Sequence, residues 1–246
     1  MKVILVIITV VLSGFLTNNA EDAAAILSKV DQTIFSLKDK SAEVEMVMIN
    51  LKTEKTKIKK ANFFQKGMDR KLFRYTYPKS DNGIATLTIP DAVYLYLPMF
   101  KKPKKITNMA EGNAFNKSDF SLEDMNTKYF SELYEPELME STARYYILRL
   151  IPKDKKSSYK YQVATINKST YYVEKMEYYN KKGERAKVSE SEYVKIDNRW
   201  VVSTVSMTNL KKKHKTKFIM TNIKINTGLS DDLFTVENMV GGGKAK

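Results

Sequence analysis

Side chains that could perform acid–base or metal chemistry are few in this chain. It contains no cysteine and one histidine, His214, which lies among lysines in what we expect to be a solvated hairpin tip. Thiolate sites, imidazole metal sites and histidine-dependent triads are therefore nearly excluded. The carboxylate pairs Glu123–Asp124 and Asp231–Asp232 could perform general acid–base work. Adjacent surface acids are far commoner, so we expect no catalytic residue, no metal and no cofactor. An envelope hydrolase using Glu123 and Asp124 is the enzymatic alternative.

Lysines interleaved with aromatic residues raise a second possibility, the binding of nucleic acid. Tyr159, Tyr161, Tyr171 and Tyr172 have lysines nearby, and the chain carries a formal net charge of +14. The lysines are spread along the whole chain and are matched by glutamates, which is typical of solvated strand faces. We therefore expect no nucleic-acid partner. The charge leaves anionic lipid headgroups and acidic proteins open as partners.

Large, adaptable apolar side chains suggest a third possibility, the binding of a lipid chain. Methionine and aromatic side chains tolerate a variable guest better than a core of valines does. The candidates for a cavity are Met46, Met48, Phe63, Tyr94, Tyr96, Leu97 and Met99, and those for its lid are Gly112, Phe115, Phe120 and Met125. Taken singly, each of these residues could instead fill an ordinary core between a sheet and a helix.

Four lysines stand close together after the tyrosine-rich part of the chain. Lys101, Lys102, Lys104 and Lys105 bracket a proline. They could contact an anionic headgroup or an acidic partner surface. They could equally form a solvated hairpin tip whose charge prevents edge-to-edge pairing.

Most of these candidates lie in residues 92–125, the stretch on which the expected fold depends. Residues 92–97 form a strand that is apolar on both faces, with tyrosines on one face and valine and leucines on the other. Pro98 ends this strand. A strand that is apolar on both faces needs a cover on each side. The polar excursion at 108–126 is a candidate for one cover, with Gly112 as its candidate hinge.

The pattern "YLYLP…KKPKKI…GNAFNKSDFSLEDM" in this stretch resembles the bacterial outer-membrane lipoprotein-sorting family, the LolA/LolB-like periplasmic carriers. That family shows an aromatic-rich strand ending in YLP, a basic turn and a segment G-x-x-F-x-x-S-D-F-S-x-E-D. The residues that match this segment are Gly112, Phe115, Ser118, Asp119, Phe120, Ser121, Glu123 and Asp124. The family's strand arginine, which holds the lid closed, cannot be assigned to Arg70, Arg74 or Arg144. That departure puts the lipoprotein cargo in doubt more than the fold.

The resemblance implies a carrier without enzymatic activity. Such a protein binds acyl chains of lipoproteins or phospholipid in a hydrophobic cavity and moves them between membranes toward the outer membrane. The resemblance also implies transient membrane contact and an inner-membrane lipid exporter as partner. Residues 231–234 resemble the family's ending, in which a phenylalanine packs under the sheet. The alternative is a non-shuttling envelope domain that senses lipid or serves as an adaptor for such an exporter.

Features of an export signal stand at the N-terminus. Lys2 precedes an apolar run, Val3–Leu16, that is too short for a confident membrane span. We interpret residues 1–20 as a signal peptide, with a retained anchor as the alternative, and residues 21–246 as a single lipid- or lipoprotein-binding domain. The expected location is the periplasm. Without a cysteine to acylate, the chain is not itself a lipoprotein.

The remaining pattern predicts one helix and many strands. Residues 21–37 carry an apolar stripe at helical spacing. The expected strands are 42–51, 55–66, 72–77, 84–89, 92–97, 106–107, 140–151, 158–166, 171–179, 186–196, 200–210 and 216–225, with a short helical turn at 128–133. Their short connections favour one antiparallel meander. So long a sheet must curl, which predicts a mainly β (α+β) fold: an open half-barrel covered by the N-terminal helix and the lid segment.

Overall fold

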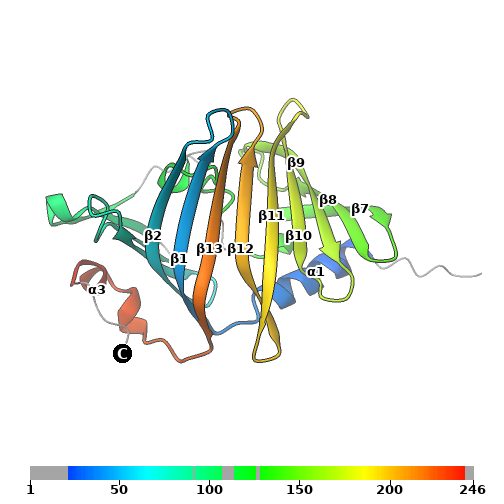
Figure 1. Cartoon of the computed structure of the whole chain (residues 1–246). Coiled ribbons are helices and arrows are strands. Elements are labelled where there is room, and N and C mark those ends of the chain that lie inside the picture. Colours follow the sequence, from blue (N-terminus) through cyan, green and yellow to red (C-terminus); the bar gives the residue numbers. More distant parts are fainter. Residues whose placement is uncertain (1–21, 91, 107–113, 126–127, 242–246) are drawn as a thin grey trace, which may run out of the picture.

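A computed structural model describes residues 22–90, 92–106, 114–125 and 128–241 and places the strands of these ranges in one antiparallel sheet (Figure 1). The strands are β1 (Asp39–Asn50), β2 (Thr56–Lys66), β3 (Arg70–Tyr77), β4 (Ala85–Ile89), β5 (Ala92–Tyr96), β6 (Pro103–Lys105), β7 (Tyr134–Ser141), β8 (Tyr145–Pro152), β9 (Tyr159–Asn167), β10 (Val173–Asn180), β11 (Arg185–Ile196), β12 (Arg199–Asn209) and β13 (His214–Ile225). The helices are α1 (Ala23–Ile34), η1 (Pro98–Phe100), η2 (Phe115–Lys117), α2 (Phe130–Leu133), η3 (Asp231–Phe234) and α3 (Val236–Gly241). The expected signal peptide lies outside the described residues. Within them, no helix has the length and apolar character needed to cross a membrane.

Strand order in this sheet is β6-β5-β4-β3-β2-β1-β13-β12-β11-β10-β9-β8-β7. The first and last strands therefore pair in the middle, and the sheet consists of two meanders rather than the one that the sequence predicts. The two free edges, β6 and β7, follow one another in the chain. The described residues between these two edges are 106, 114–125 and 128–133, which we call the crossing segment. The predicted curved, open antiparallel sheet is confirmed.

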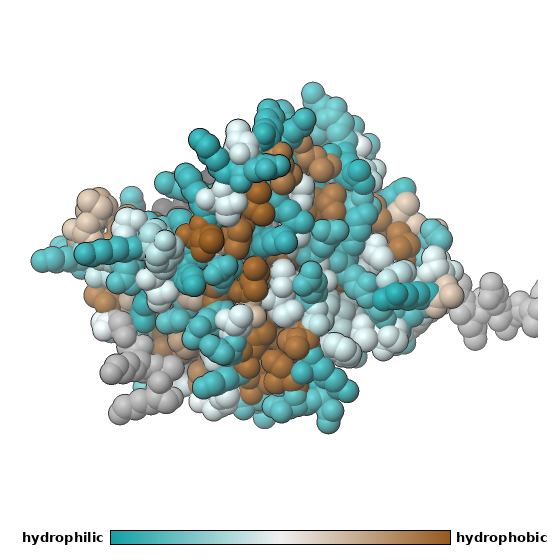
Figure 2. All heavy atoms as spheres, viewed as in Figure 1, coloured by the Kyte–Doolittle hydropathy of each residue, from teal (hydrophilic) through white to brown (hydrophobic). Residues whose placement is uncertain are grey.

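Burial along β1 identifies the inner face of the sheet. Ala42, Val44, Met46 and Met48 alternate along this strand, and all four are buried. Figure 2 shows the opposite, outer face, which is largely hydrophilic, with hydrophobic atoms in strips between polar side chains and in a patch at the lower centre of the view. In the same view of the ribbon, α1 passes behind the sheet. The core therefore lies between the inner face, α1 and the crossing segment.

Helix α1 covers part of this inner face, as predicted. It begins after the N-cap Asp22, whose carboxylate accepts a hydrogen bond from Ala24 N at 3.4 Å. Its buried apolar residues are Ile26, Leu27 and Val30. The buried Asp31 carboxylate accepts hydrogen bonds from Phe130 N at 2.7 Å and Ser131 N at 3.0 Å, at the start of α2. Asp31 thereby joins α1 to the end of the crossing segment.

C-terminal residues cover the outer face of β3–β5, where apolar side chains of these strands gather. The cluster there consists of Leu72, Ala85, Leu87, Leu229, Leu233, Phe234 and Met239, with Tyr94 and Tyr96 packed against it. The Asp39 carboxylate accepts hydrogen bonds from Thr227 N at 2.8 Å and Gly228 N at 2.9 Å, where the chain leaves β13. Phe234 thus packs under the sheet, as the resemblance implies.

Residues 134–152 differ from the sequence-based expectation. The sequence predicts a single strand over 140–151, but a turn separates β7 from β8. Thr142 makes this turn without glycine or proline, because its hydroxyl accepts a hydrogen bond from Tyr145 N at 2.8 Å. Pro136 lies inside β7, which is an edge strand, where a missing amide hydrogen need not cost a ladder hydrogen bond.

Candidate functional site

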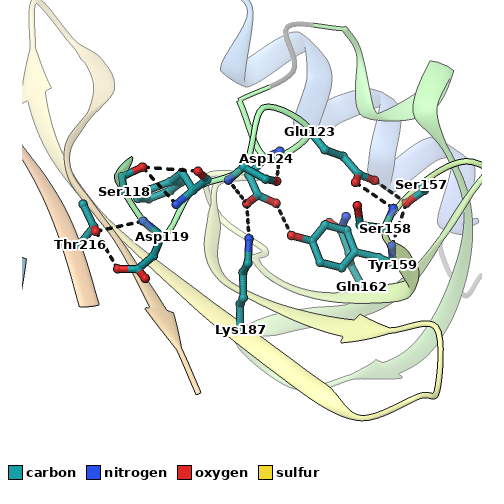
Figure 3. Close-up of polar contacts among 12 residues, drawn as sticks. Ser118, Asp119, Glu123, Asp124, Ser157, Ser158, Tyr159, Gln162, Lys187 and Thr216 are labelled. Carbon is teal, nitrogen blue, oxygen red and sulfur yellow. Dashed lines mark hydrogen bonds and ion pairs between the residues drawn. The ribbon is translucent and has the colours of Figure 1, made fainter. Parts of the chain in front are cut away.

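Three carboxylates hold residues 114–125 of the crossing segment against the sheet (Figure 3). The first is Asp119, which is buried. Its Oδ2 accepts a hydrogen bond from Thr216 Oγ1 at 2.7 Å and lies 2.6 Å from His214 Nδ1. Thr216 Oγ1 in turn accepts a hydrogen bond from Asp119 N at 3.1 Å. The sequence predicts that His214 lies in a solvated hairpin tip, and this prediction is wrong. His214 is the first residue of β13 and pairs with Asp119 of the crossing segment.

Asp124 is the second of these carboxylates, and its side chain is 0% exposed. Its Oδ1 accepts a hydrogen bond from Tyr159 Oη at 2.7 Å, and its Oδ2 lies 2.8 Å from Lys187 Nζ. Oδ2 also accepts a hydrogen bond from Ser121 N at 2.6 Å. Because Tyr159 belongs to β9 and Lys187 to β11, Asp124 joins the crossing segment to two strands far from it in the sequence.

Glu123 is the third, and it contacts the loop before β9. Its carboxylate accepts hydrogen bonds from the Ser157 hydroxyl and, at 2.9 Å, from Ser158 N. Both members of the pair that the sequence offers for hydrolysis are therefore engaged in holding the crossing segment. The described residues contain no cluster of three or more His, Asp or Glu that could hold a metal ion.

Aromatic rings attach the same segment to the apolar inner face. Phe120 is 4% exposed, and its ring centroid lies 5.1 Å from that of Phe218 in β13. Phe115 meets Phe73 of β3 edge-to-face at 6.0 Å. The two predicted lid phenylalanines thus contact strands from both halves of the sheet.

Two cavities lie along the inner face. The larger, about 530 Å³, lies between β2–β5 and the crossing segment; its apolar lining includes Phe63, Val93, Leu95, Phe115 and Met125. The smaller, about 340 Å³, lies between the C-terminal end of α1 and strands β10–β12; its lining includes Ile34, Phe120, Met176, Trp200 and Val205. Lys71 and Met125 line both, so the two cavities adjoin. Each volume falls in the range of about 300–1,000 Å³ that small-molecule sites occupy.

The predicted cavity residues do not all reach these cavities. Phe63 does, but Met46 and Met48 are buried in the core outside both linings. Tyr94 and Tyr96 face the C-terminal residues on the other side of the sheet. The reason is the two-residue period of a strand: β5 turns its valine and leucine inward and its tyrosines outward, and the sequence of a doubly apolar strand does not say which face is inside.

Residues at the end of β5 lie at the surface. Leu97 is partly exposed, and Met99 is 80% exposed beside Phe100 at 63%. The candidate headgroup residues Lys101, Lys102, Lys104 and Lys105 are also exposed around this pair. Of the predicted lid residues, Phe115 and Met125 line the larger cavity and Phe120 the smaller, while Gly112 lies outside the described residues.

The sequence analysis does not name two lysines that line the cavities. Lys40 and Lys71 both line the smaller cavity, and each is only partly exposed. Burial lowers the pKa of Lys40 to about 8. Burial, together with the positive charge of Lys40, lowers the pKa of Lys71 to about 8. A signal for Lys40 does exist in the sequence, because it stands in phase with the inward-facing Ala42, Val44 and Met46.

Two of the arginines named in the sequence analysis, Arg70 and Arg74, have partners outside the crossing segment. Arg70 pairs with Asp231, and Arg74 Nη2 donates to Asn238 O at 2.9 Å. Both therefore bind C-terminal residues. The described crossing segment is held instead by Lys187, Tyr159 and Thr216. No short sequence motif marks these three residues.

Comparison with known proteins gives a family match and a fold match. A family model described as "Uncharacterized protein" matches residues 67–240. A structure of an outer membrane lipoprotein-sorting protein domain from Vibrio parahaemolyticus has 24% identity and a TM-score of 0.80, over 90% of this chain and 100% of that one. A DUF1329 family protein from Desulfovibrio piger has 24% identity and a TM-score of 0.79, over 88% and 97%. A LolA superfamily protein from Nitrosomonas europaea has 21% identity and a TM-score of 0.69, over 87% and 97%. No curated protein matches the chain in sequence.

Proposed function

The chain belongs to the family whose model matches its residues 67–240 and has the LolA-like fold of lipoprotein-sorting proteins, and we propose that it is a periplasmic carrier of acyl chains. Residues 1–20 are its signal peptide, and residues 21–246 form one binding domain. The carrier holds an acyl chain of a phospholipid or lipoprotein in the cavities of the inner face and moves it toward the outer membrane. It performs no reaction and uses no cofactor.

One observation carries this proposal: two adjoining cavities with apolar linings lie between the sheet and a segment that crosses it. Moving an acyl chain through water costs about 0.8 kcal/mol per methylene, or on the order of 12 kcal/mol for a palmitoyl chain. A carrier must return most of this free energy by enclosing the chain, which an open surface groove would do poorly. The crossing segment supplies the enclosure with Phe115, Phe120 and Met125.

Binding can be followed with the chain's single tryptophan. Trp200 lines the smaller cavity, so its fluorescence reports on a guest there. We expect palmitoyl lysophospholipid, added below its micelle concentration, to shift and saturate this emission at one lipid per chain. The variant L95F, which fills part of the larger cavity, is expected to weaken binding at least about tenfold. The matched control Y94F changes the adjacent residue, which faces the other side of the sheet. Equal affinity in L95F, Y94F and the wild type would remove the larger cavity from the proposal.

Transient membrane contact is assigned to the exposed tip formed by Met99 and Phe100 and their four neighbouring lysines. Two apolar side chains that project from a basic surface suit the interface of an anionic bilayer, where acyl chains lie under negative headgroups. The tip follows β5, whose valine and leucine line the larger cavity. Docking there would bring that cavity close to the membrane that supplies or receives the lipid.

The second candidate function is a non-shuttling envelope sensor or adaptor that works with an inner-membrane lipid exporter. The buried ion pair of Asp124 with Lys187 favours it, because a cover fixed in this way is costly to move. Transfer of a fluorescent phospholipid between donor and acceptor vesicles separates the two functions. A carrier accelerates transfer, whereas a sensor binds the lipid without accelerating its transfer.

A further inference from the structure

We propose that the guest of these cavities carries an anionic headgroup, held by Lys40 of β1 and Lys71 of β3. This inference rests on the proposed lipid-binding function and narrows it to one class of lipid. The headgroup is a phosphate or a carboxylate, and its acyl chain extends into the apolar parts of the two adjoining cavities.

Strand register places the two lysines in one row across the sheet. Lys40 pairs with Gln65 of β2, and Gln65 pairs with Lys71. Directly paired residues of antiparallel strands project on the same face with their Cβ atoms about 5 Å apart. All three side chains line the smaller cavity, and Lys71 lines the larger one as well. The next residue in the row, Thr88 of β4, also lines the larger cavity. A Lys–Gln–Lys–Thr row of hydrogen-bond donors therefore crosses the inner face beside the apolar parts of the two cavities.

Neither lysine has an anionic partner in the described part of the chain. The Lys40 ammonium lies 5.3 Å from the centroid of the Phe63 ring, and the structure gives it no carboxylate. The two carboxylates that line the same cavity are engaged elsewhere, Asp39 by backbone amides at 227–229 and Asp124 by Lys187 and Tyr159. A partly buried ammonium group is costly without a counter-charge. Two of them on the same face, with the Gln65 side chain between them, therefore make a receptor for an anion.

Other titratable groups around the cavities do not replace that anion. Tyr172, Tyr178 and Tyr193 line the smaller cavity, and burial raises the pKa of each, so they stay neutral near pH 8. Lys117 lines the larger cavity and adds a third positive charge. Among the described lining residues, Lys40, Lys71 and Lys117 thus stand against two carboxylates, Asp39 and Asp124, which are already bound by other donors.

An anion-binding row distinguishes between the two guests left open above. The glycerophosphate of an anionic phospholipid, or the carboxylate of a fatty acid, supplies the required charge next to an acyl chain. A diacylglyceryl group on a lipoprotein cysteine carries no anion at that position. The row therefore favours an anionic lipid over the acyl chains of a lipoprotein.

The test compares lipids that share one acyl chain and differ in the headgroup. Trp200 fluorescence is titrated at pH 7 with palmitoyl-lysophosphatidylglycerol, palmitate and monopalmitoylglycerol, and with inorganic phosphate alone. We expect both anionic lipids to bind at least about tenfold more tightly than the neutral one, as charge-assisted hydrogen bonds would give. The variant K40M/K71M should bind all three lipids with the affinity of the neutral one. The control K155M/K182M removes the same charge from exposed turns and should keep the preference.

Each result decides a different claim. Equal affinity for neutral and anionic lipids in the wild type, or an unchanged preference in K40M/K71M, would overturn the anionic headgroup and leave the carrier proposal standing. Binding of none of the lipids would overturn the proposed function itself. Competition by inorganic phosphate as strong as that by the lysolipid would show a site for a free anion instead. The single variant K71E gives a second readout, because it should bind the neutral lipid more tightly than the anionic ones.

Discussion

Asp124 and Lys187 form a buried ion pair, with 2.8 Å between Oδ2 and Nζ, that fastens the crossing segment to β11. The two residues are 63 positions apart in the chain. The pair is completed by Tyr159, whose hydroxyl donates to the other carboxylate oxygen. Any opening of the described crossing segment must break this pair, and its strength therefore sets the free energy of opening.

Removing one member of the pair is expected to destabilise the protein strongly. In D124A the Lys187 ammonium is left buried without its counter-charge, which typically costs about 3–5 kcal/mol of unfolding free energy. The double variant D124A/K187M should recover part of this loss, and urea unfolding of the single and double variants measures the coupling. The nearby control E123Q should cost less, because the neutral amide that it introduces can still accept a hydrogen bond from Ser157. Strictly additive losses in the double variant would contradict the ion pair.

Stability should rise with pH because of the cavity lysines. The folded-state pKa of Lys40 and Lys71 is about 8, below the ordinary value of 10.5, so the unfolded chain binds more protons between these two values. The free energy of unfolding should therefore increase from pH 8 to pH 10, by about 1–2 kcal/mol per lysine, since partial exposure reduces the full effect. Denaturant unfolding at a series of pH values measures the slope. K40M/K71M should lose most of this slope and be more stable than the wild type at pH 7; an unchanged slope would contradict the burial of these charges.

How much of this could be predicted from the sequence depends on the range of each interaction. The strands and their turns follow from local alternation and turn residues. The matched segment of the family pattern contains Asp119, Glu123 and Asp124, but their partners Thr216, Ser157 and Lys187 lie 34 to 97 positions away. Only the tertiary fold brings them together. The same limit applies to the pairing of β1 with β13.

Doubly apolar strands set a second limit. In β5 the alternation identifies two faces, but hydrophobicity cannot rank them, because both are covered. The sequence-based prediction names Tyr94 and Tyr96 as cavity residues, whereas Val93 and Leu95 of this strand line the larger cavity of the structure. The crossing segment covers one face of β5 and the C-terminal residues cover the other. Which segment covers which face depends on the direction in which the chain leaves the sheet.

Binding to anionic vesicles should depend on the exposed tip. Each lysine near an anionic surface contributes about 1 kcal/mol, so replacing Lys101, Lys102, Lys104 and Lys105 with Gln should weaken binding at least about 100-fold at low salt. The double variant M99S/F100S should remove the component of binding that persists at high salt. The control replaces Lys155, Lys156, Lys181 and Lys182, which are equally exposed, with Gln. Vesicle co-sedimentation measures all three. Equal losses in the two lysine variants would indicate net charge alone and contradict docking through the tip.

Asp39 should contribute to stability only above acidic pH. Burial alone would raise the pKa of its carboxyl, but hydrogen bonds from Thr227, Gly228 and Leu229 outweigh this and lower the pKa below 3.8. The stabilisation is therefore fully present above the unfolded-state value and is lost as the pH falls through the lowered one. D39N should lose about 1–3 kcal/mol at pH 7 and less at pH 2, where more of the wild-type carboxyl is protonated. Thermal unfolding at both pH values tests this, and an equal loss at both would contradict the role of the charge.

The most direct test of acyl-chain binding is native mass spectrometry of the mature protein, exported in a bacterial host and purified without detergent. A delipidated and refolded sample of the same protein serves as the control. We predict one extra mass per chain that matches an anionic phospholipid or fatty acid, that is absent after delipidation and that returns when the lipid is added back. A mass equal to that of the protein alone, unchanged by added lipid, would contradict the carrier function.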